Sequence, residues 1–301
     1  MTDALLAAAR LRWGLGEAPI TLIAARENRV FRVDLPHGPA ALRLHRRGYR
    51  TIAELRSELQ WMAMLADHAI PVPAPIPAAD GTRLLFHDGI AIDMLTWLDG
   101  TPLSAAAPSE QTYFNLGDLI ARMHICADAW TPPPDFTRPT WDIVGDTPTW
   151  GRYWENPALS PDETRVFSQF RDHTTTALKQ LATADTGLIH ADLVPENVLL
   201  HAGQLQPIDF DDGGFGHRLF DLATVTFRSR RTGPTGALAR ATIAGYQSRR
   251  PLDIDTLPLF EALRACTYVG WNITRMKEDG GTTRNTRFIT AALEAIQNAQ
   301  P

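Results

Sequence analysis

The chain has 301 residues, of which 44% are hydrophobic and 21% are charged, and its formal net charge at pH 7 is −5. This composition is typical of a globular protein with a sizeable core, and it excludes a disordered or fibrous chain. The mildly acidic balance gives no electrostatic reason to expect nucleic acid as a partner.

The first hundred residues predict a strand-rich part that contains one long helix. Two short runs within 20–46 flank a turn rich in proline and glycine and predict a pair of strands. Apolar residues then recur at helical spacing over 51–68, which predicts a helix. The segment 71–77 must be extended, because each of its prolines lacks an N–H and restricts the residue before it. Two further strands are expected at 83–86 and 90–95.

The rest of the chain predicts mainly helices. We expect helices over 109–128 and 160–181 and again within 235–300, with short strands and loops over 188–207. The segment 131–157 is irregular and rich in proline and tryptophan. Its tryptophans are expected to pack in the core, with a platform for a substrate as the alternative.

This order of elements indicates an α+β fold with two lobes. We expect a small N-terminal lobe at 1–96, built from an antiparallel sheet and one long helix. A larger, mostly helical lobe is expected at 97–301. The cleft between two such lobes is a favoured place for a small-molecule site.

Nothing in the sequence points to export or to a membrane. The two cysteines, Cys126 and Cys266, form no CxxC pattern, so we expect neither a disulfide scaffold nor a cysteine zinc site. This use of cysteine is typical of a protein in a reducing compartment. The N-terminus lacks the pattern of a signal peptide, and no run approaches the roughly 18 apolar residues of a membrane span. We therefore expect a soluble, cytoplasmic protein with no membrane partner.

The most informative segment is 187–200, which contains His190 and Asp192 and, five positions after Asp192, Asn197. The next strand-like piece leads to Asp209. Phosphoryl transfer from ATP needs a carboxylate for the attacking hydroxyl and oxygen ligands for magnesium. An Asp, an Asn five residues on and a later Asp supply these groups in the order found in kinases. The pattern predicts Asp192 as the catalytic base and Asn197 and Asp209 as metal ligands, with ATP and Mg as cofactors.

Simpler interpretations exist for the same residues. Asp192 could cap a loop, and Asn197 and Asp209 could be turn residues. By residue type alone, a zinc site could be made of His190, Asp192, His201 and His217, although no pair has familiar ligand spacing. The apolar strands on both sides of the motif favour the kinase interpretation.

Five pieces of the chain, in order, carry a resemblance to a known family. They lie at 27–33, 95–100, 116–124, 187–200 and 208–223. Together they resemble the nucleotide loop, hinge, helix, catalytic loop and metal-binding strand of the aminoglycoside phosphotransferase and choline kinase-like phosphotransferase enzyme family. Within it the chain is most similar to the stress-response kinases and the homoserine kinase-like enzymes. The resemblance implies a bilobal protein-kinase-like fold. In it the N-terminal lobe at 1–96 would bind the nucleotide, and the C-terminal lobe at 97–301 would carry the catalytic and acceptor-binding groups.

The resemblance also implies roles for residues outside the motif. Asn28 would lie in the nucleotide loop. Thr96, Trp97 and Leu98 would form the hinge, with backbone groups of Thr96 and Leu98 on adenine. Asp221 would be structural and accept hydrogen bonds from the catalytic loop.

Three neighbours of the motif keep more than one interpretation. His190 is expected to support the catalytic loop structurally rather than to transfer a proton. Asp211 and Asp212 stay open between extra metal-shell groups and solvated residues.

Two departures from the family pattern concern the phosphates. The segment 24–28 has no glycine, so its phosphate contacts stay open. The strand lysine is also missing: Lys179 and Lys277 are the only lysines among 29 basic residues, and Arg43 stands in its place.

An arginine can contact phosphate oxygens bidentately, so Arg43 can replace the lysine. Glu58, beside the apolar face of the helix, is the expected partner of Arg43, and Glu54 is the second candidate. The alternative is that Arg43 is an exposed strand residue in a surface salt bridge and that no cation acts there.

The leading hypothesis is an ATP- and Mg-dependent kinase for a hydroxyl of a small molecule such as an amino alcohol, a sugar or an antibiotic. A protein Ser/Thr kinase of the bacterial stress-response type is the alternative. A non-catalytic pseudokinase is a third class. It would lack Asp192, Asn197 or Asp209, and all three are present.

Overall fold

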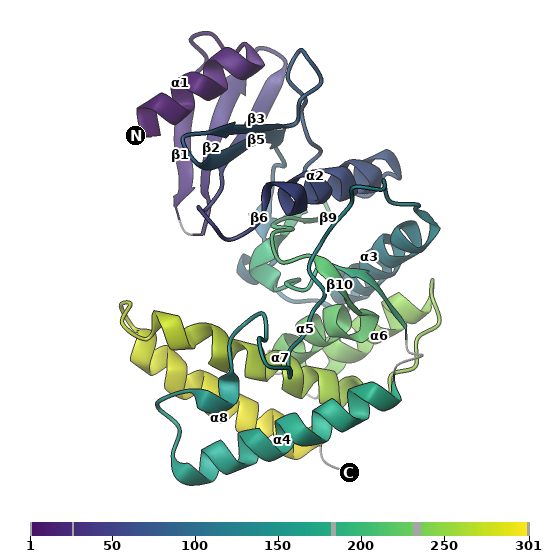
Figure 1. Ribbon diagram of the computed structural model, residues 1–301. Helices are drawn as coiled ribbons and strands as arrows, with labels where there is room; N and C mark the ends of the chain where they lie inside the picture. Colours follow the sequence, from purple (N-terminus) through teal and green to yellow (C-terminus); the bar gives the residue numbers. More distant parts are fainter. Residues whose placement is uncertain (1, 26, 182–184, 231–235, 300–301) are drawn as a thin grey trace. The chain divides into compact units, whose positions relative to one another are not determined.

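The computed structural model describes residues 2–25, 27–181, 185–230 and 236–299. Its internal contacts divide the chain into two compact units (Figure 1). Unit 1 consists of Met1–Ala106, Cys126–Arg138 and Glu196–Asp211, and unit 2 of Ala107–Ile125, Pro139–Pro195 and Asp212–Pro301. Sheets and helices are mixed, so the predicted α+β class is confirmed. The division into a nucleotide-binding lobe and a catalytic lobe stays a prediction.

A five-stranded antiparallel sheet is the centre of unit 1. Its strand order is β1-β2-β3-β5-β4. The predicted strand pairs are present, and β1 is an additional strand. The strands are β1 (Ile20–Ala25), β2 (Arg29–Leu35), β3 (Gly38–Leu44), β4 (Leu84–His87) and β5 (Ile90–Thr96).

Two helices belong to unit 1. Helix α1 (Thr2–Trp13), which the sequence analysis did not predict, packs on the sheet through the fully buried Leu5 and Ala9 (Figure 1). Helix α2 (Ile52–Asp67) starts where Thr51 and Glu54 form a capping box, an arrangement that typically stabilises a helix by about 0.5–2 kcal/mol. Glu58 on α2 is fully buried, so its charge requires a partner.

A second sheet in unit 1 contains the hairpin that lies between Asn197 and Asp209 in the chain. Its strand order is β6-β8-β9, with β6 (Thr101–Pro102), β8 (Val198–His201) and β9 (Gln204–Pro207). The 3-10 turn η3 (Pro195–Asn197) leads into β8, and Asp209 follows β9. The Ile208 N–H donates a 2.9 Å hydrogen bond to the Asn197 carbonyl. This bond keeps the start of the hairpin next to its end.

Helices make up most of unit 2, as the sequence predicts. The central one is α7 (Leu257–Asn272), which packs against α5 and α8 and has 13 buried residues among its 16. Short 3-10 turns accompany the helices: η2 (Tyr153–Glu155) and η5 (Ile273–Arg275), with η1 (Leu103–Ala105) in unit 1. The other helices are α3 (Glu110–Ala129), α4 (Pro161–Gln180), α5 (Arg218–Arg230), α6 (Ala237–Gln247) and α8 (Gly281–Ala299).

Two close approaches shape the inside of unit 2. Helices α3 and α6 touch at Gly117 and Gly245, where an added Cβ would lie 1.9 Å from the backbone of the opposite helix. The strands β7 (Thr186–Ile189) and β10 (Gly214–His217) pair in an antiparallel ribbon. Trp150 is buried and stacks on Trp141 at 3.4 Å between ring centres, which agrees with the predicted core packing.

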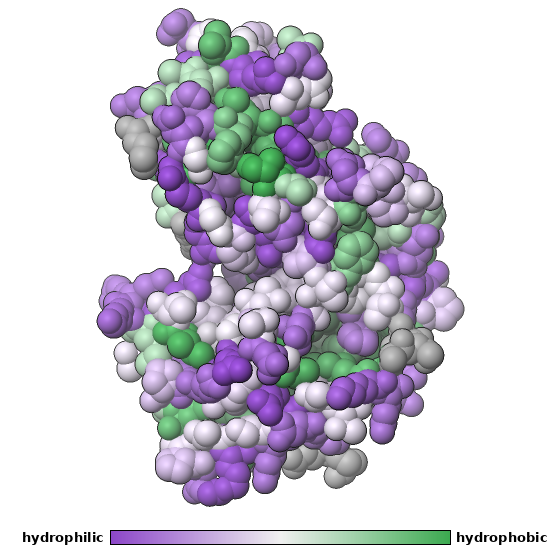
Figure 2. Space-filling view, in the orientation of Figure 1, coloured by the Kyte–Doolittle hydropathy of each residue, from purple (hydrophilic) through white to green (hydrophobic). Residues whose placement is uncertain are grey.

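The surface of unit 1 is partly hydrophobic. Figure 2 shows green hydrophobic residues gathered over its five-stranded sheet. Leu22 and Ile23 of β1 are about half exposed, at 51% and 52%, just before the segment that resembles a nucleotide loop. Among the described helices, none combines the length and the apolar character that crossing a bilayer requires.

Candidate active site

In unit 1, Arg43 and Glu58 form the ion pair that the sequence analysis expects. Arg43 Nη1 lies 2.9 Å from Glu58 Oε1, and both side chains are buried. Arg43 is also held by Asp93 of β5, the residue directly opposite it in the sheet. Its Nε and Nη2 donate to the two carboxylate oxygens of Asp93 at 2.9 and 2.7 Å. This fork-to-carboxylate pairing fixes the guanidinium plane, so Arg43 is not an exposed surface residue.

The same aspartate binds a histidine. His45 Nε2 lies 2.8 Å from Asp93 Oδ2, and both residues are buried. Burial alone lowers the pKa of His45, but the Asp93 charge and hydrogen bond outweigh it, so the pKa is raised. Burial alone raises the pKa of Asp93, but Arg43 and His45 hold it well below its usual range. Asp93 is therefore a carboxylate anchored by two basic groups.

An arginine and a tryptophan hold the chain segment after Asp209. The buried Arg138 donates from Nη2 to the carbonyls of Phe210 and Asp211 at 2.9 and 2.8 Å, and its Nη1 lies 3.4 Å from Glu58. Phe210 packs edge-on against Trp61 of α2, with 5.1 Å between ring centres. The backbone beside the proposed metal ligand is thus fixed by one side chain from each of two other segments.

Asn28 and Asp211 meet in unit 1. The Asn28 amide donates to Asp211 Oδ2 and accepts from the Arg46 N–H at 2.9 Å. The other oxygen of Asp211, Oδ1, is buried, accepts no hydrogen bond from the described residues and lies 3.9 Å from Arg43 Nη1. Asp211 is therefore a buried part of this cluster and not a solvated residue.

The proposed hinge follows β5. The Thr96 N–H donates to the Ala74 carbonyl at 2.8 Å, so this amide is already committed. The Trp97 ring donates to Asp99 at 3.0 Å and lies under Arg32. Among the described residues the Leu98 backbone makes no hydrogen bond. Thr96 and Leu98 are the two residues whose backbone groups are expected to contact adenine. Of the two, Leu98 is the one whose backbone N–H and carbonyl are available.

The two proposed metal ligands lie at the ends of the β8–β9 hairpin. The backbone bond from Ile208 to Asn197 keeps Asn197 close to the residue that follows Ile208, which is Asp209. Asp209 has a left-handed backbone with φ of 65°, which is rare outside glycine and clusters at functional sites. In the described part of the chain no three His, Cys, Asp or Glu side chains form a group that could hold a metal ion.

In unit 2, Asp221 holds the loop that presents Asp192. The Asp221 carboxylate accepts the N–H of His190 at 2.8 Å and the N–H of Ala191 at 2.6 Å. His190 is fully buried, and its ring accepts a long bond of 3.4 Å from the Asp192 N–H. Asp221 thus accepts hydrogen bonds from the backbone of this loop, and the structural roles expected of His190 and Asp221 stay predictions.

The residue before Asp192 is strained. Ala191 has φ of 68°, the left-handed region, which costs a residue with a Cβ about 1–2 kcal/mol. Such a conformation persists where neighbours hold it. Here Asp221 binds the N–H of Ala191, and Arg264 Nη1 binds its carbonyl at 3.3 Å.

Arg264 of α7 also contacts Asp192 itself. Its Nη2 donates to Asp192 Oδ1 and to the Tyr268 hydroxyl, the latter at 3.0 Å. Burial alone lowers the pKa of Arg264, but the nearby Tyr268 and Asp192 raise it. The Asp192 side chain keeps 27% of its exposure.

Behind Asp221 lies a second buried pair. His124 Nε2 is 3.1 Å from Asp221 Oδ2, and His124 Nδ1 is 2.9 Å from the Tyr246 hydroxyl. Burial lowers the pKa of His124, and the contact with Asp221 offsets this only in part. Burial alone raises the pKa of Asp221, but its hydrogen bonds from His124 and from the loop lower it.

The sequence analysis missed several residues of these clusters, including Asp93, Arg264, His45 and Arg138. Asp93 and Arg264 each carry a charge within an apolar stretch, and a charged residue at a buried position signals a partner. His45 directly follows β3 and gives a weaker signal. Arg138 lies in the proline-rich segment, where periodicity gives no signal at all.

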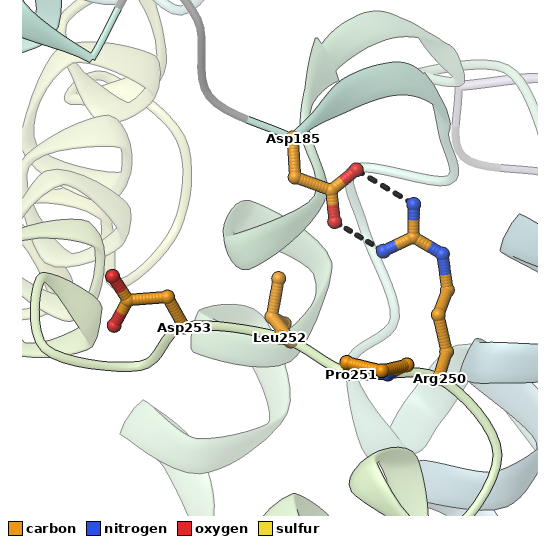
Figure 3. Close-up of a pocket in the computed structure, with 5 residues that line it drawn as sticks. All are labelled: Asp185, Arg250, Pro251, Leu252 and Asp253. Carbon is orange, nitrogen blue, oxygen red and sulfur yellow. Dashed lines mark hydrogen bonds and ion pairs between the residues drawn. The ribbon is translucent and has the colours of Figure 1, made fainter.

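A pocket of about 730 Å³ lies elsewhere in unit 2 (Figure 3). Its lining contains none of the predicted site residues. Asp185 and Arg250 face each other in a two-bond ion pair, and Arg250 reaches the Tyr246 hydroxyl at 3.3 Å. The pocket wall therefore belongs to the same polar network that supports Asp221.

The sequence comparisons identify the family. Residues 19–258 match the model of the phosphotransferase enzyme family. An uncharacterized protein of Deinococcus radiodurans is 30% identical over 300 residues, covering 94% of this chain and 85% of that protein. A homoserine kinase of Neisseria meningitidis is 27% identical, covering 74% of this chain and 72% of the enzyme.

Solved structures agree with the fold. A microcompartment-associated aminopropanol kinase is 27% identical and superposes with a TM-score of 0.84 over 99% of both chains. An amicoumacin kinase in complex with AMP-PNP, Ca²⁺ and Ami is 21% identical, with a TM-score of 0.82 over 97% of this chain and 93% of the other.

The chain belongs to the phosphotransferase enzyme family, which confirms the resemblance seen in its sequence. It has the protein-kinase-like fold of that family, and it is a kinase with an alcohol group as acceptor.

Proposed function

We propose that this kinase transfers the γ-phosphate of ATP, with magnesium, to the hydroxyl of a small molecule that also carries an amine. The observation that carries the proposal is the clamped loop of unit 2. A strained residue, Ala191, sets the backbone from which Asp192 projects, and Asp221 binds the two preceding N–H groups. Backbone strain held in place by buried partners is a mark of a working site.

The residues of unit 1 fit a magnesium ion. Magnesium prefers oxygen ligands, and it usually takes one or two carboxylates, with phosphate oxygens and waters completing its shell. Asn197 and Asp209 would supply such oxygens, and the buried Oδ1 of Asp211, which accepts no hydrogen bond from the described residues, is a further acceptor in this cluster. A bound magnesium ion offsets the negative charge of the phosphates.

In the proposed reaction each protein group has one task. Asp192 accepts the proton of the acceptor hydroxyl as its oxygen bonds to the γ-phosphorus, while the bond to the β-phosphate oxygen breaks and ADP leaves. His190 and Asp221 hold the loop. In unit 1, Arg43 with Glu58 would lie toward the phosphates, and Asn28 and Leu98 would contact the nucleotide.

The acceptor class comes from the relatives. The aminopropanol kinase and the homoserine kinases are named for acceptors in which a hydroxyl lies a few bonds from an amine. The relatives whose acceptors are named act on small molecules, and no observation favours a protein acceptor. We therefore propose an amino alcohol or a hydroxylated amino acid.

Release of ADP tests the function directly. We expect 1-aminopropan-2-ol or homoserine to stimulate ADP release far more than propane-1,2-diol, which keeps the hydroxyl but lacks the amine. Equal stimulation by the diol would contradict the amine requirement. No stimulation by any small hydroxyl compound would contradict the proposed function.

The variant Asp192→Ala tests the assignment of the base. Phosphoryl transfer should fall by roughly 10³-fold, within the usual range for a general base, while ATP binding measured by calorimetry stays within a few-fold. Asp172→Ala is the matched control, because Asp172 is an exposed aspartate of α4. Unchanged turnover in Asp192→Ala would rule out the assignment.

A further inference from the structure

The strongest unassigned feature is a buried arginine in the middle of the central helix of unit 2. Arg264 is only 3% exposed and lies among apolar residues of α7. A buried guanidinium is strongly unfavourable unless its charge and donors have partners. Packing of α7 against its neighbours therefore does not explain why a charged residue stands at this buried position.

The partners of Arg264 lie on the loop that presents Asp192. One nitrogen, Nη2, donates to Asp192 Oδ1, and the other, Nη1, donates to the Ala191 carbonyl at 3.3 Å. The planar guanidinium thus spans the strained residue and the side chain that follows it. Asp221 holds the opposite, N–H side of Ala191.

Aromatic rings fix the guanidinium. Its central carbon lies 4.4 Å from the centre of the Tyr268 ring and 5.8 Å from each of the Trp150 and Phe220 rings. Tyr268 also accepts a hydrogen bond from Nη2 at 3.0 Å. These contacts restrict the orientation of the planar guanidinium, and a flexible lysine ammonium would not reproduce them.

Leu193 and Val194, which follow Asp192, are apolar. Arg264 brings a positive charge to the Asp192 carboxylate from a helix 72 residues later in the chain. A general base acts only within hydrogen-bond reach of the proton that it accepts. Fixing one oxygen of the carboxylate and the backbone before it limits where the carboxylate can lie.

We propose that Arg264 is the positioning residue of Asp192: it acts through the catalytic carboxylate and not on the acceptor or the nucleotide. This inference rests on the proposed function, because it assigns a role toward the proposed base. It predicts a defect in the chemical step with nucleotide binding intact, whereas a merely structural arginine would change stability without separating kcat from KM.

The first test compares Arg264→Met with Arg264→Lys. In Arg264→Met kcat should fall about 100-fold, the scale of a misplaced catalytic group, while the KM for ATP stays within twofold. Arg264→Lys, which keeps the charge, should recover part of that loss. Arg284→Met is the control, because Arg284 of α8 pairs with Glu278 and lies 5.4 Å from the Trp271 ring. A wild-type kcat in Arg264→Met, or an equal loss in the control, would overturn the proposal.

The second test asks whether Arg264 acts through Asp192. If it does, Arg264→Met should lower the residual rate no further once Asp192 is already alanine. Losses that multiply in the double variant would overturn the proposal. Where Arg264→Met does not fold, Arg264→Lys takes its place in this comparison.

The third test does not depend on the reaction. Amide hydrogen exchange over residues 189–193 should be at least tenfold faster in Arg264→Met than in the wild type and unchanged in Arg284→Met. Unchanged exchange in Arg264→Met would overturn the positioning role. A wild-type protein without kinase activity would contradict the proposed function instead, and the exchange result would still decide the role of Arg264.

Discussion

Each unit holds a buried histidine against a buried aspartate, and the two pairs respond to their surroundings in opposite ways. In unit 1, His45 lies 2.8 Å from Asp93 and the pKa of His45 is raised. In unit 2, His124 lies 3.1 Å from Asp221 and the pKa of His124 is lowered. Both pairs have similar geometry, so the distance between the partners does not decide the direction in which the pKa of the histidine shifts.

The charges around the two histidines differ. Against burial and the charge of Arg43, Asp93 and Asp211 raise the pKa of His45. Burial, together with Arg218 and Arg250, lowers the pKa of His124, and Asp221 offsets them only in part.

The two aspartates also differ: Asp93 accepts hydrogen bonds from the side chains of Arg43 and His45, whereas Asp221 also accepts them from two backbone N–H groups. Unit 1 is thus held by balanced charges, and the loop of unit 2 by a carboxylate that orders the backbone. Variants can test each half of this contrast.

The largest effect is expected from Arg43→Met in unit 1. Removing one partner of a buried ion pair leaves uncompensated charge, here on Asp93 and Glu58, and destabilises by about 3–5 kcal/mol. Urea denaturation measures the loss. The double variant Arg43→Met with Asp93→Asn should recover part of it, because one orphaned charge is gone. A loss below about 1 kcal/mol in the single variant would mean that charge balance does not hold unit 1 together.

A smaller loss is expected from Asp221→Asn in unit 2. The amide keeps one acceptor, but its NH₂ group then faces a backbone donor, and an unsatisfied buried group costs about 1–3 kcal/mol. Phosphoryl transfer should fall as well, since the loop carrying Asp192 loses its anchor. Urea denaturation and ADP release measure the two effects. A full wild-type rate in a folded Asp221→Asn protein would contradict the anchoring role.

The smallest effects concern how the free energy of unfolding depends on pH. His45 and His124 should contribute slopes of opposite sign. The folded pKa of His45 is raised, so its contribution is complete below its unfolded value of about 6.5 and is lost as the pH rises through the folded pKa. The folded pKa of His124 is lowered, so acidification below about pH 6.5 destabilises the protein. Each slope is at most about 1.4 kcal/mol per pH unit.

Urea midpoints of His45→Gln and His124→Gln between pH 5 and 9 separate the two slopes. His45→Gln should flatten the alkaline side of the profile, and His124→Gln the acid side. Two variants that change the same side would show that the contrast between the units is wrong.

The fold was predictable where local patterns decide it. The capping box at Ser160 and Glu163 begins α4 at Pro161. The turn predicted around Asp88 and Gly89 connects the strands β4 and β5. Helix α1 was not foreseen, because only two of its residues, Leu5 and Ala9, are buried and its apolar face is narrow. Where tertiary packing supplies the stability of a helix, a short sequence window carries little signal.

The sequence indicated single residues of the candidate site but not its clusters. The motif predicts roles for Asp192, Asn197 and Asp209, and these roles stay predictions. The kinase-like pattern together with helical spacing predicted Glu58 as the partner of Arg43, and the two form an ion pair. Neither Asp93 opposite Arg43 nor Arg264 at Asp192 follows from spacing, because pairing across a sheet and between distant helices is set by the tertiary fold. A charge inside an apolar run shows only that a partner exists, not which residue it is.

The arginine at position 43 also decides which chemical probes can report on this enzyme. Nucleotide analogues with an acylating group label a kinase through the amine of a lysine beside the phosphates. A guanidinium stays protonated at any pH that the protein tolerates and is a poor nucleophile. Both lysines, Lys179 and Lys277, are exposed residues of unit 2. Such reagents would mark the surface and leave the proposed nucleotide site unlabelled, so a survey based on lysine labelling would overlook this kinase.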